Sequence, residues 1–231
     1  MKIKYGMILA AGLGKRMNPI TLKTPKPLIK IGNKNLLERS IQLLINHGVE
    51  EIVINVHYLA YQITDFIKSK KYKVKITISD EQNFLLGTGG GVLKAIKNYN
   101  EPFIVINPDT LWSNNYSSEL KNLEDLYFKE KKTCLLLVNK DLSFDKSFNG
   151  DFNLNASIIS RDNNNAYIFT GLQILNQGIF NSVNENIFSM NQVWNNLIKD
   201  NCLIGIQSKQ KFLHLNTKKM YDKILDLNIT D

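Results

Sequence analysis

Cysteine, histidine and proline are scarce in this chain, and it has no long hydrophobic run. Among its 231 residues are two cysteines, three histidines and five prolines. Two cysteines cannot form the disulfide framework of small secreted proteins, so we expect Cys134 and Cys202 to be reduced core residues. No apolar run approaches the ~20 residues of a membrane-spanning helix. The first six residues are too short and polar for a secretory signal. The sequence therefore indicates a cytoplasmic protein without a membrane partner.

Basic residues outnumber acidic ones, 29 to 21, which gives a net charge of +8. Such a surface suits nucleic acids, or small anionic ligands such as nucleotides. The lysines are scattered, and the chain shows no zinc-finger, RNP or helix-turn-helix pattern. We therefore expect phosphate-bearing small molecules as ligands and no nucleic-acid partner. No sequence pattern predicts an oligomeric state.

Glycines and cations concentrate in the connection that follows the first apolar run, Ile3–Leu9. It carries Gly12, Gly14, Lys15 and Arg16 within five residues. Small residues let backbone amides approach a polyanion closely, and cations neutralise it. The segment is therefore predicted to bind phosphate.

Two common phosphate motifs do not fit this connection. A Walker A loop requires Gly-Lys-Ser/Thr, whereas Arg16 follows Gly14 and Lys15. A dinucleotide fingerprint requires a third glycine, whereas Met17 occupies that position. The connection is therefore a phosphate loop of another kind.

Apolar runs typical of buried strands alternate along the chain with amphipathic stretches typical of helices. This alternation predicts a mostly parallel central sheet with helices on both faces. The fold class expected is α/β, with one Rossmann-like domain over residues 1–231 and a small β-hairpin layer in the C-terminal half. The expected strands are Ile3–Leu9, Ile52–Val56, Val74–Ser79, Phe103–Ile106, Thr133–Val138, Leu172–Leu175, Cys202–Ile206 and Phe212–Leu215, with short pieces at Ala156–Ile159 and Ala166–Phe169. The expected helices are Leu36–His47, Ala60–Lys68, Gly91–Asn98, Leu120–Lys131, Phe188–Lys199 and a last one capped by Thr217 and ending at Leu227.

Three motifs follow predicted strands directly: the 10–27 loop, the 80–90 loop and Asp109. Parallel sheets bind ligands at the carboxyl ends of their strands. The pattern alone therefore predicts that these motifs converge on one site.

The connection also resembles a family signature, L-A-A-G-x-G-x-R followed by P-x-T and P-K-P. The matching residues are Leu9–Arg16, Pro19–Thr21 and Pro25–Pro27. Further motifs follow in the order typical of that family, the sugar-1-phosphate nucleotidyltransferases: Gly87–Gly91, Asn107–Asp109, Gly150–Phe152 and Thr170–Gly171. The chain looks most like the N-acetylmuramate-1-phosphate uridylyltransferase and mannose-1-phosphate guanylyltransferase branch.

The resemblance implies transfer of a nucleoside monophosphate from a nucleoside triphosphate to a sugar-1-phosphate. This reaction needs positioning and charge neutralisation, with no general base. Arg16 is the candidate for the leaving β,γ-phosphates, because its planar fork matches phosphate. Lys26 is the candidate at the reacting centre. Asp109 is the candidate ligand of Mg²⁺, with Mn²⁺ as an alternative ion.

The resemblance also implies two sets of binding residues. Those expected around the nucleotide are Ala10, Ala11, Gly12, Leu13, Gly14, Lys15, Glu81, Gly87 and Thr88. Those expected around the sugar are Asn107, Gly150, Asp151, Thr170 and Gly171. The entropic cost of Gly89, Gly90 and Gly91 suggests close approach of a ligand there. Close packing at a helix start is the alternative reading.

One position departs from the family pattern. The family segment V-D-V-G-T, whose aspartate is the second metal ligand, corresponds to 213–217, where His214 replaces that aspartate. Imidazole suits Mg²⁺ poorly. His214 is therefore either a metal ligand or a hydrogen-bonded core residue.

Several functions stay open on the sequence alone. UTP with N-acetylmuramate-1-phosphate is the first choice of substrates and GTP with mannose-1-phosphate the second. A phosphocholine cytidylyltransferase-like enzyme shares the first loop. A nucleotide-sugar-binding regulatory protein weakened in catalysis by His214 is the non-enzymatic alternative.

Overall fold

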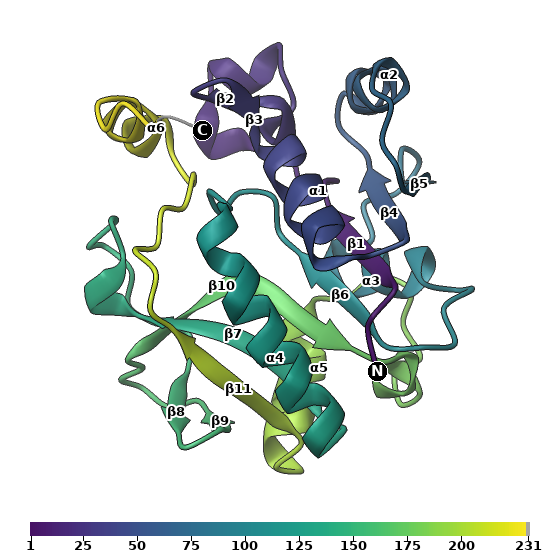
Figure 1. Cartoon of the computed structure of the whole chain (residues 1–231), viewed down its shortest axis with the longest axis vertical. Coiled ribbons are helices and arrows are strands. Elements are labelled where there is room, and N and C mark those ends of the chain that lie inside the picture. Colours follow the sequence, from purple (N-terminus) through teal and green to yellow (C-terminus); the bar gives the residue numbers. More distant parts are fainter. Residues whose placement is uncertain (230–231) are drawn as a thin grey trace.

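A nine-stranded sheet in the order β5-β4-β1-β6-β10-β7-β11-β9-β8 forms the centre of the computed structural model, which describes residues 1–229 (Figure 1). Its strands are β1 (Tyr5–Leu9), β4 (Glu51–Val56), β5 (Lys75–Asp80), β6 (Phe103–Ile106), β7 (Thr133–Asn139), β8 (Asn153–Asn155), β9 (Ile158–Ser160), β10 (Tyr167–Leu175) and β11 (Leu203–Ser208). A separate hairpin pairs β2 (Lys30–Ile31) with β3 (Lys34–Asn35).

Strand β10 is the exception to the parallel order of the main strands. It lies between β6 and β7 and runs antiparallel to both, whereas β5, β4, β1 and β6 are mutually parallel and β7 is parallel to β11. The sequence predicted two short strands, 166–169 and 172–175. They form one strand whose register shifts between Phe169 and Gln173. Because β10 is reversed, its central residues lie beside the carboxyl end of β6.

Helices cover both faces of the sheet, as predicted (Figure 1). The core on one face includes residues of α1 (Leu36–His47), α2 (Ala60–Ser69) and α4 (Ser117–Glu130). The core on the other includes residues of α3 (Gly87–Ala95) and α5 (Met190–Lys199). A smaller core joins α6 (Lys218–Leu225) to the β2–β3 hairpin region. No helix among residues 1–229 has the length and apolar character to cross a bilayer.

Local signals set the ends of α1 as the sequence predicted. The Asn35 side chain accepts a hydrogen bond from the Glu38 amide at 2.7 Å, which satisfies a free donor of the first turn. Gly48 ends the helix with φ of 96°, a left-handed conformation that glycine adopts without a Cβ penalty. At the other end of the chain, Thr217 caps α6 by accepting from the Met220 amide.

The C-terminal half contains the predicted hairpin layer in a changed form. Strands β8 and β9 make an antiparallel hairpin that extends the sheet beyond β11. The expected strand Phe212–Leu215 forms only isolated bridges, Thr110 to His214 and Ser143 to Phe212. Both cysteines are free, as expected, but only Cys134 is fully buried.

Helix α3 begins at Gly87, four residues earlier than predicted, so the glycine cluster lies inside it. A Cβ at Gly89 would lie 2.3 Å from the Phe188 ring, and one at Gly90 would lie 2.3 Å from the Asn186 carbonyl oxygen. Gly91 would meet the carboxylate of Glu81 at 2.7 Å. Packing within the protein therefore accounts for these three glycines, as the alternative of close packing at a helix start predicts.

We expect Gly90→Ala to lower the free energy of unfolding by about 1–3 kcal/mol, because overpacking forces backbone to move. The loss should appear although alanine is the better helix former by about 1 kcal/mol. Gly12→Ala is the matched control, since a Cβ at Gly12 has nothing within 4 Å. Urea denaturation measures both. Equal stability of the two variants would contradict this packing argument.

Candidate functional site

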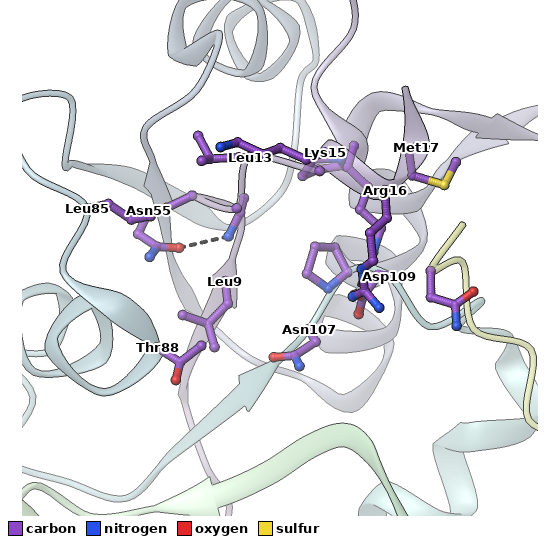
Figure 2. A pocket seen from close by; sticks show the side chains of 18 of the residues that line it. Leu9, Leu13, Lys15, Arg16, Met17, Asn55, Leu85, Thr88, Asn107 and Asp109 are labelled. Carbon is purple, nitrogen blue, oxygen red and sulfur yellow. Dashed lines mark hydrogen bonds and ion pairs between the residues drawn. The ribbon is translucent and has the colours of Figure 1, made fainter. Parts of the chain in front are cut away.

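A cavity of about 430 Å³ opens at the carboxyl ends of β1, β4 and β6. It contains most of the residues predicted to bind the nucleotide: Ala10, Ala11, Gly12, Leu13, Gly14, Lys15, Gly87 and Thr88. The three predicted catalytic residues, Arg16, Lys26 and Asp109, line it as well. Figure 2 shows Leu13, Lys15 and Arg16 along one border and Thr88 and Asn107 along the opposite one. The convergence predicted from the strand ends is therefore present.

The turn at Gly14 directs the cationic side chains. Gly14 has φ of 63° and precedes a short 3-10 helix, η1 (Lys15–Met17). Its carbonyl oxygen accepts a hydrogen bond from the Thr21 hydroxyl at 2.9 Å, and Met17 is fully buried. Lys15 and Arg16 remain exposed between these two anchors. The hydrogen bond from Thr21 and the burial of Met17 thus fix the loop backbone, while its two cations stay at the border of the cavity.

Asn55 fixes the start of this loop. Its side-chain oxygen accepts from the Ala10 amide at 2.8 Å (Figure 2), and its side-chain nitrogen donates to Glu81 at 2.7 Å. The second oxygen of Glu81 accepts from the Leu86 amide at 3.3 Å. Both side chains are 2 % exposed. Asn55 therefore couples the first loop to the 80–90 loop.

This arrangement reveals one residue that the sequence analysis missed. Glu81, expected to contact the nucleotide, does not line this cavity, and its carboxylate orients Asn55. Asn55 lines the cavity. A buried amide within the apolar run Ile52–Val56 was the available signal for it.

Three ionisable groups meet at the floor of the cavity. Lys26, in the short 3-10 helix η3 (Lys26–Leu28), donates to Asp109 Oδ2 at 2.8 Å. His214 Nε2 lies 3.0 Å from the same oxygen. The Lys26 side chain is 14 % exposed and that of Asp109 is 25 % exposed. Within residues 1–229, Asp109 Oδ1 has no hydrogen bond.

Opposing effects set the pKa of Asp109. Burial raises this pKa, but the Lys26 ammonium and the His214 imidazole lower it more strongly through charge and hydrogen bonding. The pKa of the carboxyl therefore lies well below its usual range. Asp109 is a carboxylate at any pH at which the protein functions.

The depressed pKa predicts how stability responds to acid. Unfolded Asp titrates near pH ~3.9, so the stabilisation should be complete above that pH and lost as pH falls toward the lower folded pKa. We expect the stability advantage of the Asp109 protein over Asp109→Asn not to shrink from pH 7 to 5 and to fall below pH ~4. Urea denaturation of both proteins in the presence of a chelator, with His214 in place, measures this difference. A difference that shrinks already between pH 7 and 5.5 would show a raised pKa.

Local backbone pairing brings His214 to Asp109. The Leu111 amide donates to the Leu213 carbonyl at 2.8 Å, and the Leu215 amide donates to the Asp109 carbonyl at 2.7 Å. The imidazole stacks on Phe212 at 5.6 Å between ring centroids, and its Nδ1 is buried without a hydrogen bond to residues 1–229. The two expected metal ligands are therefore adjacent. Within 1–229, however, no group of three or more His, Cys, Asp or Glu residues is placed to hold a metal ion.

A second cavity of about 210 Å³ adjoins the first. Both are lined by Asn107 and Asp109, so the two cavities meet at the end of β6. Of the residues expected around the sugar, Asn107, Asp151, Thr170 and Gly171 line it. Gly150 does not line it. A Cβ at Gly150 would lie 2.3 Å from the Asn165 carbonyl oxygen, so this glycine packs closely against the neighbouring turn.

Gly171 and Thr170 make close contacts with neighbouring segments at the point where the two cavities meet. Gly171 has φ of 94°, and a Cβ there would lie 2.8 Å from Cβ of Asn107. The Thr170 hydroxyl donates to the Leu136 carbonyl, while the Thr110 hydroxyl donates to the Thr170 carbonyl. These contacts fix the end of β6 against β10. They place Asn107 between the two cavities.

Comparisons with known proteins give a family match and similar folds. The family model described as nucleotidyl transferase matches residues 5–143. N-acetylmuramate alpha-1-phosphate uridylyltransferase of Caulobacter vibrioides is 29 % identical over 221 residues, covering 92 % of this chain and 91 % of that protein. Mannose-1-phosphate guanyltransferase of Saccharomyces cerevisiae is 40 % identical over 111 residues, but these span 46 % of this chain and 30 % of that protein. A solved UDP-glucose pyrophosphorylase in complex with UDP-glucose superposes with a TM-score of 0.81 at 20 % identity, covering 98 % of each chain.

Proposed function

This chain belongs to the nucleotidyl transferase family as a sugar-1-phosphate nucleotidyltransferase, and we propose that it transfers uridylate from UTP to N-acetylmuramate-1-phosphate. The products are a nucleoside diphosphate sugar and pyrophosphate. The choice of substrates is supported by the similarity to the Caulobacter uridylyltransferase, which extends over nearly the whole of both chains.

One observation carries the proposal: the glycine-rich loop, Lys26 and Asp109 line a single cavity that continues into a second, smaller one. The larger cavity offers exposed cations at its border and an ion pair at its floor. Two polyanionic substrates must be brought together for an oxygen of the sugar phosphate to attack the α-phosphorus. The nucleotide occupies the larger cavity, and the sugar occupies the smaller.

Charge neutralisation is divided between two cations. Arg16, exposed at the loop, binds the β- and γ-phosphates and stabilises the charge that grows on pyrophosphate as it leaves. Lys26 uses one ammonium hydrogen on Asp109, and two remain for oxygens of the reacting phosphates. Asp109 orients Lys26 and keeps it at the junction of the cavities. The attacking phosphate oxygen is already anionic, so no side chain has to remove a proton.

The loop supplies room as well as charge. A Cβ at Gly12 would meet no protein atom within 4 Å, although the residue lines the cavity. The absence of a side chain there leaves space for a ligand, in contrast to the tightly packed glycines of α3. Backbone groups of this loop and of Gly87 and Thr88 bracket the base and ribose.

Mg²⁺ fits Asp109 better than it fits His214. Oδ1 of Asp109 is an oxygen ligand without a hydrogen bond within 1–229, and Mg²⁺ commonly takes one or two carboxylates, with phosphate oxygens and water completing its shell. The bound ion would add positive charge at the phosphates. The His214 imidazole binds Oδ2 instead and positions the carboxylate.

Two other functions have specific support. The 40 % identity with the yeast guanyltransferase favours GTP with mannose-1-phosphate as the alternative substrates. The imidazole of His214, which contacts Asp109 at the position where the resembling family has its second metal-binding aspartate, favours a weakened enzyme that binds nucleotide sugars.

A pyrophosphate-release assay separates these functions. Each of the common nucleoside triphosphates is combined with N-acetylmuramate-1-phosphate, mannose-1-phosphate or phosphocholine, with Mg²⁺ or Mn²⁺. We expect UTP with N-acetylmuramate-1-phosphate to give the highest kcat/KM. Faster turnover with GTP and mannose-1-phosphate would replace the proposed substrates. If no pair releases pyrophosphate but the protein binds nucleotide measurably, the chain is the nucleotide-sugar-binding protein and not an active enzyme.

A further inference from the structure

The smaller cavity is lined by an arginine, Arg161, that forms no salt bridge within residues 1–229. Arg161 Nε donates to the Asp151 carbonyl at 3.0 Å, and its terminal nitrogens donate to Asn195 Oδ1 at 2.9 Å and to Asn191 Oδ1 at 3.0 Å. Each of these acceptor groups is uncharged. None of the ion pairs formed within 1–229 includes Arg161. The nearby Asp151 side chain is engaged instead by the Phe169 amide at 2.9 Å.

The guanidinium is held rigidly and is partly removed from water. It lies over the ring of Phe152 at 4.4 Å from the centroid, and Phe152 is fully buried. Burial lowers the pKa of Arg161, with the charge of Asp151 acting in the opposite direction. Arginine nevertheless stays protonated in proteins. The cavity wall therefore carries a fixed, partly desolvated positive charge, which interacts more strongly with an anion than a fully solvated one.

The position of Arg161 separates it from the reacting phosphate. The two cavities share Asn107 and Asp109, next to Lys26, whereas Arg161 lines only the smaller one and is tied to α5. The phosphate that is transferred must lie near the shared residues. Arg161 therefore faces the sugar portion of the acceptor.

We propose that Arg161 binds a carboxylate on the sugar ring of the acceptor, so that the enzyme selects acidic sugar-1-phosphates over neutral ones. This inference rests on the proposed function. Arginine has five N–H donors, of which three are used within the protein, leaving one on each terminal nitrogen. Each remaining donor can form a charge-assisted hydrogen bond with a carboxylate oxygen.

A pair of acceptors tests the proposal directly. N-acetylmuramate-1-phosphate differs from N-acetylglucosamine-1-phosphate only in a lactyl ether that carries a carboxylate. We expect Arg161→Gln to lower kcat/KM for the carboxylated acceptor by about 10–100-fold, mainly through KM, because a charged hydrogen bond is lost. The value for the neutral acceptor should change by less than about threefold. Equal losses with both acceptors would overturn the proposal and assign Arg161 to the fold or to the shared phosphate.

A matched variant separates the charge of Arg161 from its tethers. Asn195→Ala removes one hydrogen bond to the guanidinium and keeps the charge, and Asn195 does not line either cavity. This variant should keep the preference for the carboxylated acceptor. A loss of preference as complete as in Arg161→Gln would contradict the proposal.

Equilibrium binding distinguishes failure of this inference from failure of the proposed function. Absence of transfer with either acceptor would refute the proposed function. Calorimetric titration of the same two sugar phosphates into wild type and Arg161→Gln would still measure how much Arg161 contributes to the affinity for each sugar. A tenfold or larger selective loss of affinity for the carboxylated sugar would support the role of Arg161. Identical changes for both sugars would overturn it.

Discussion

Arg16→Ala is expected to lower kcat at least ~100-fold, which is the typical effect of removing one donor that stabilises a transition state. Arg16 lines the larger cavity and is otherwise exposed. Its charge matters most when the bond to pyrophosphate breaks, so kcat should fall more than affinity for the triphosphate. Steady-state and single-turnover assays of pyrophosphate release measure this.

Lys23→Ala is the matched control for Arg16. Lys23 is an exposed cation of the same connection but does not line the cavity. Its loss should change kcat by no more than about twofold, as is usual for surface substitutions. Near wild-type turnover of Arg16→Ala, or equal losses in both variants, would remove Arg16 from the site.

Lys26→Met is expected to have the largest effect, with kcat/KM lowered by roughly a thousandfold. The substitution keeps most of the aliphatic stem, removes the cation at the reacting centre and leaves Asp109 with His214 as its remaining partner. Two consequences therefore combine: weaker neutralisation of the reacting phosphates and a less well-oriented carboxylate. Stopped-flow measurement of product formation with saturating substrates separates this loss from reduced binding.

Lys30→Met provides the comparison for Lys26. Lys30 follows in the same segment, is exposed and does not line either cavity. Activity should stay within about twofold of wild type. Circular dichroism should show that both variants remain folded. A folded Lys26→Met protein with normal turnover would refute the role assigned to the Lys26–Asp109 pair.

The position of the glycine- and cation-rich loop at a cavity could be predicted because its residue types rarely occur together for other reasons. Closely spaced glycines and cations directly after an apolar strand indicate anion binding, and the parallel order fixes the edge at which Asp109 joins them. The sequence could not predict that β10 runs antiparallel to β6 and β7, because an apolar run does not indicate the direction of a strand relative to its neighbours. That reversal places Thr170 and Gly171 beside Asn107, where the two cavities meet.

Tertiary contacts, which the sequence does not show, determine what several of the candidate residues pack against. The glycines of α3 and Gly150 give the same sequence signal as a ligand-binding loop, and in the structure they pack closely against other parts of the protein. Glu81 is polar and follows a strand, yet its carboxylate is used by Asn55 and Leu86. Arg161 lies at the start of an asparagine-rich turn and gives no periodic or motif signal. Its position in the cavity wall depends on contacts with α5 and Phe152.

A crystal structure with Mg²⁺ and a UTP analogue that cannot be cleaved between the α- and β-phosphates tests the central claim most directly. The triphosphate should lie along residues 11–16, with its β- and γ-phosphates against Arg16 and its α-phosphate beside Lys26 and Asp109. A nucleotide bound outside the larger cavity, or none at saturating concentration, would contradict the assignment of this loop.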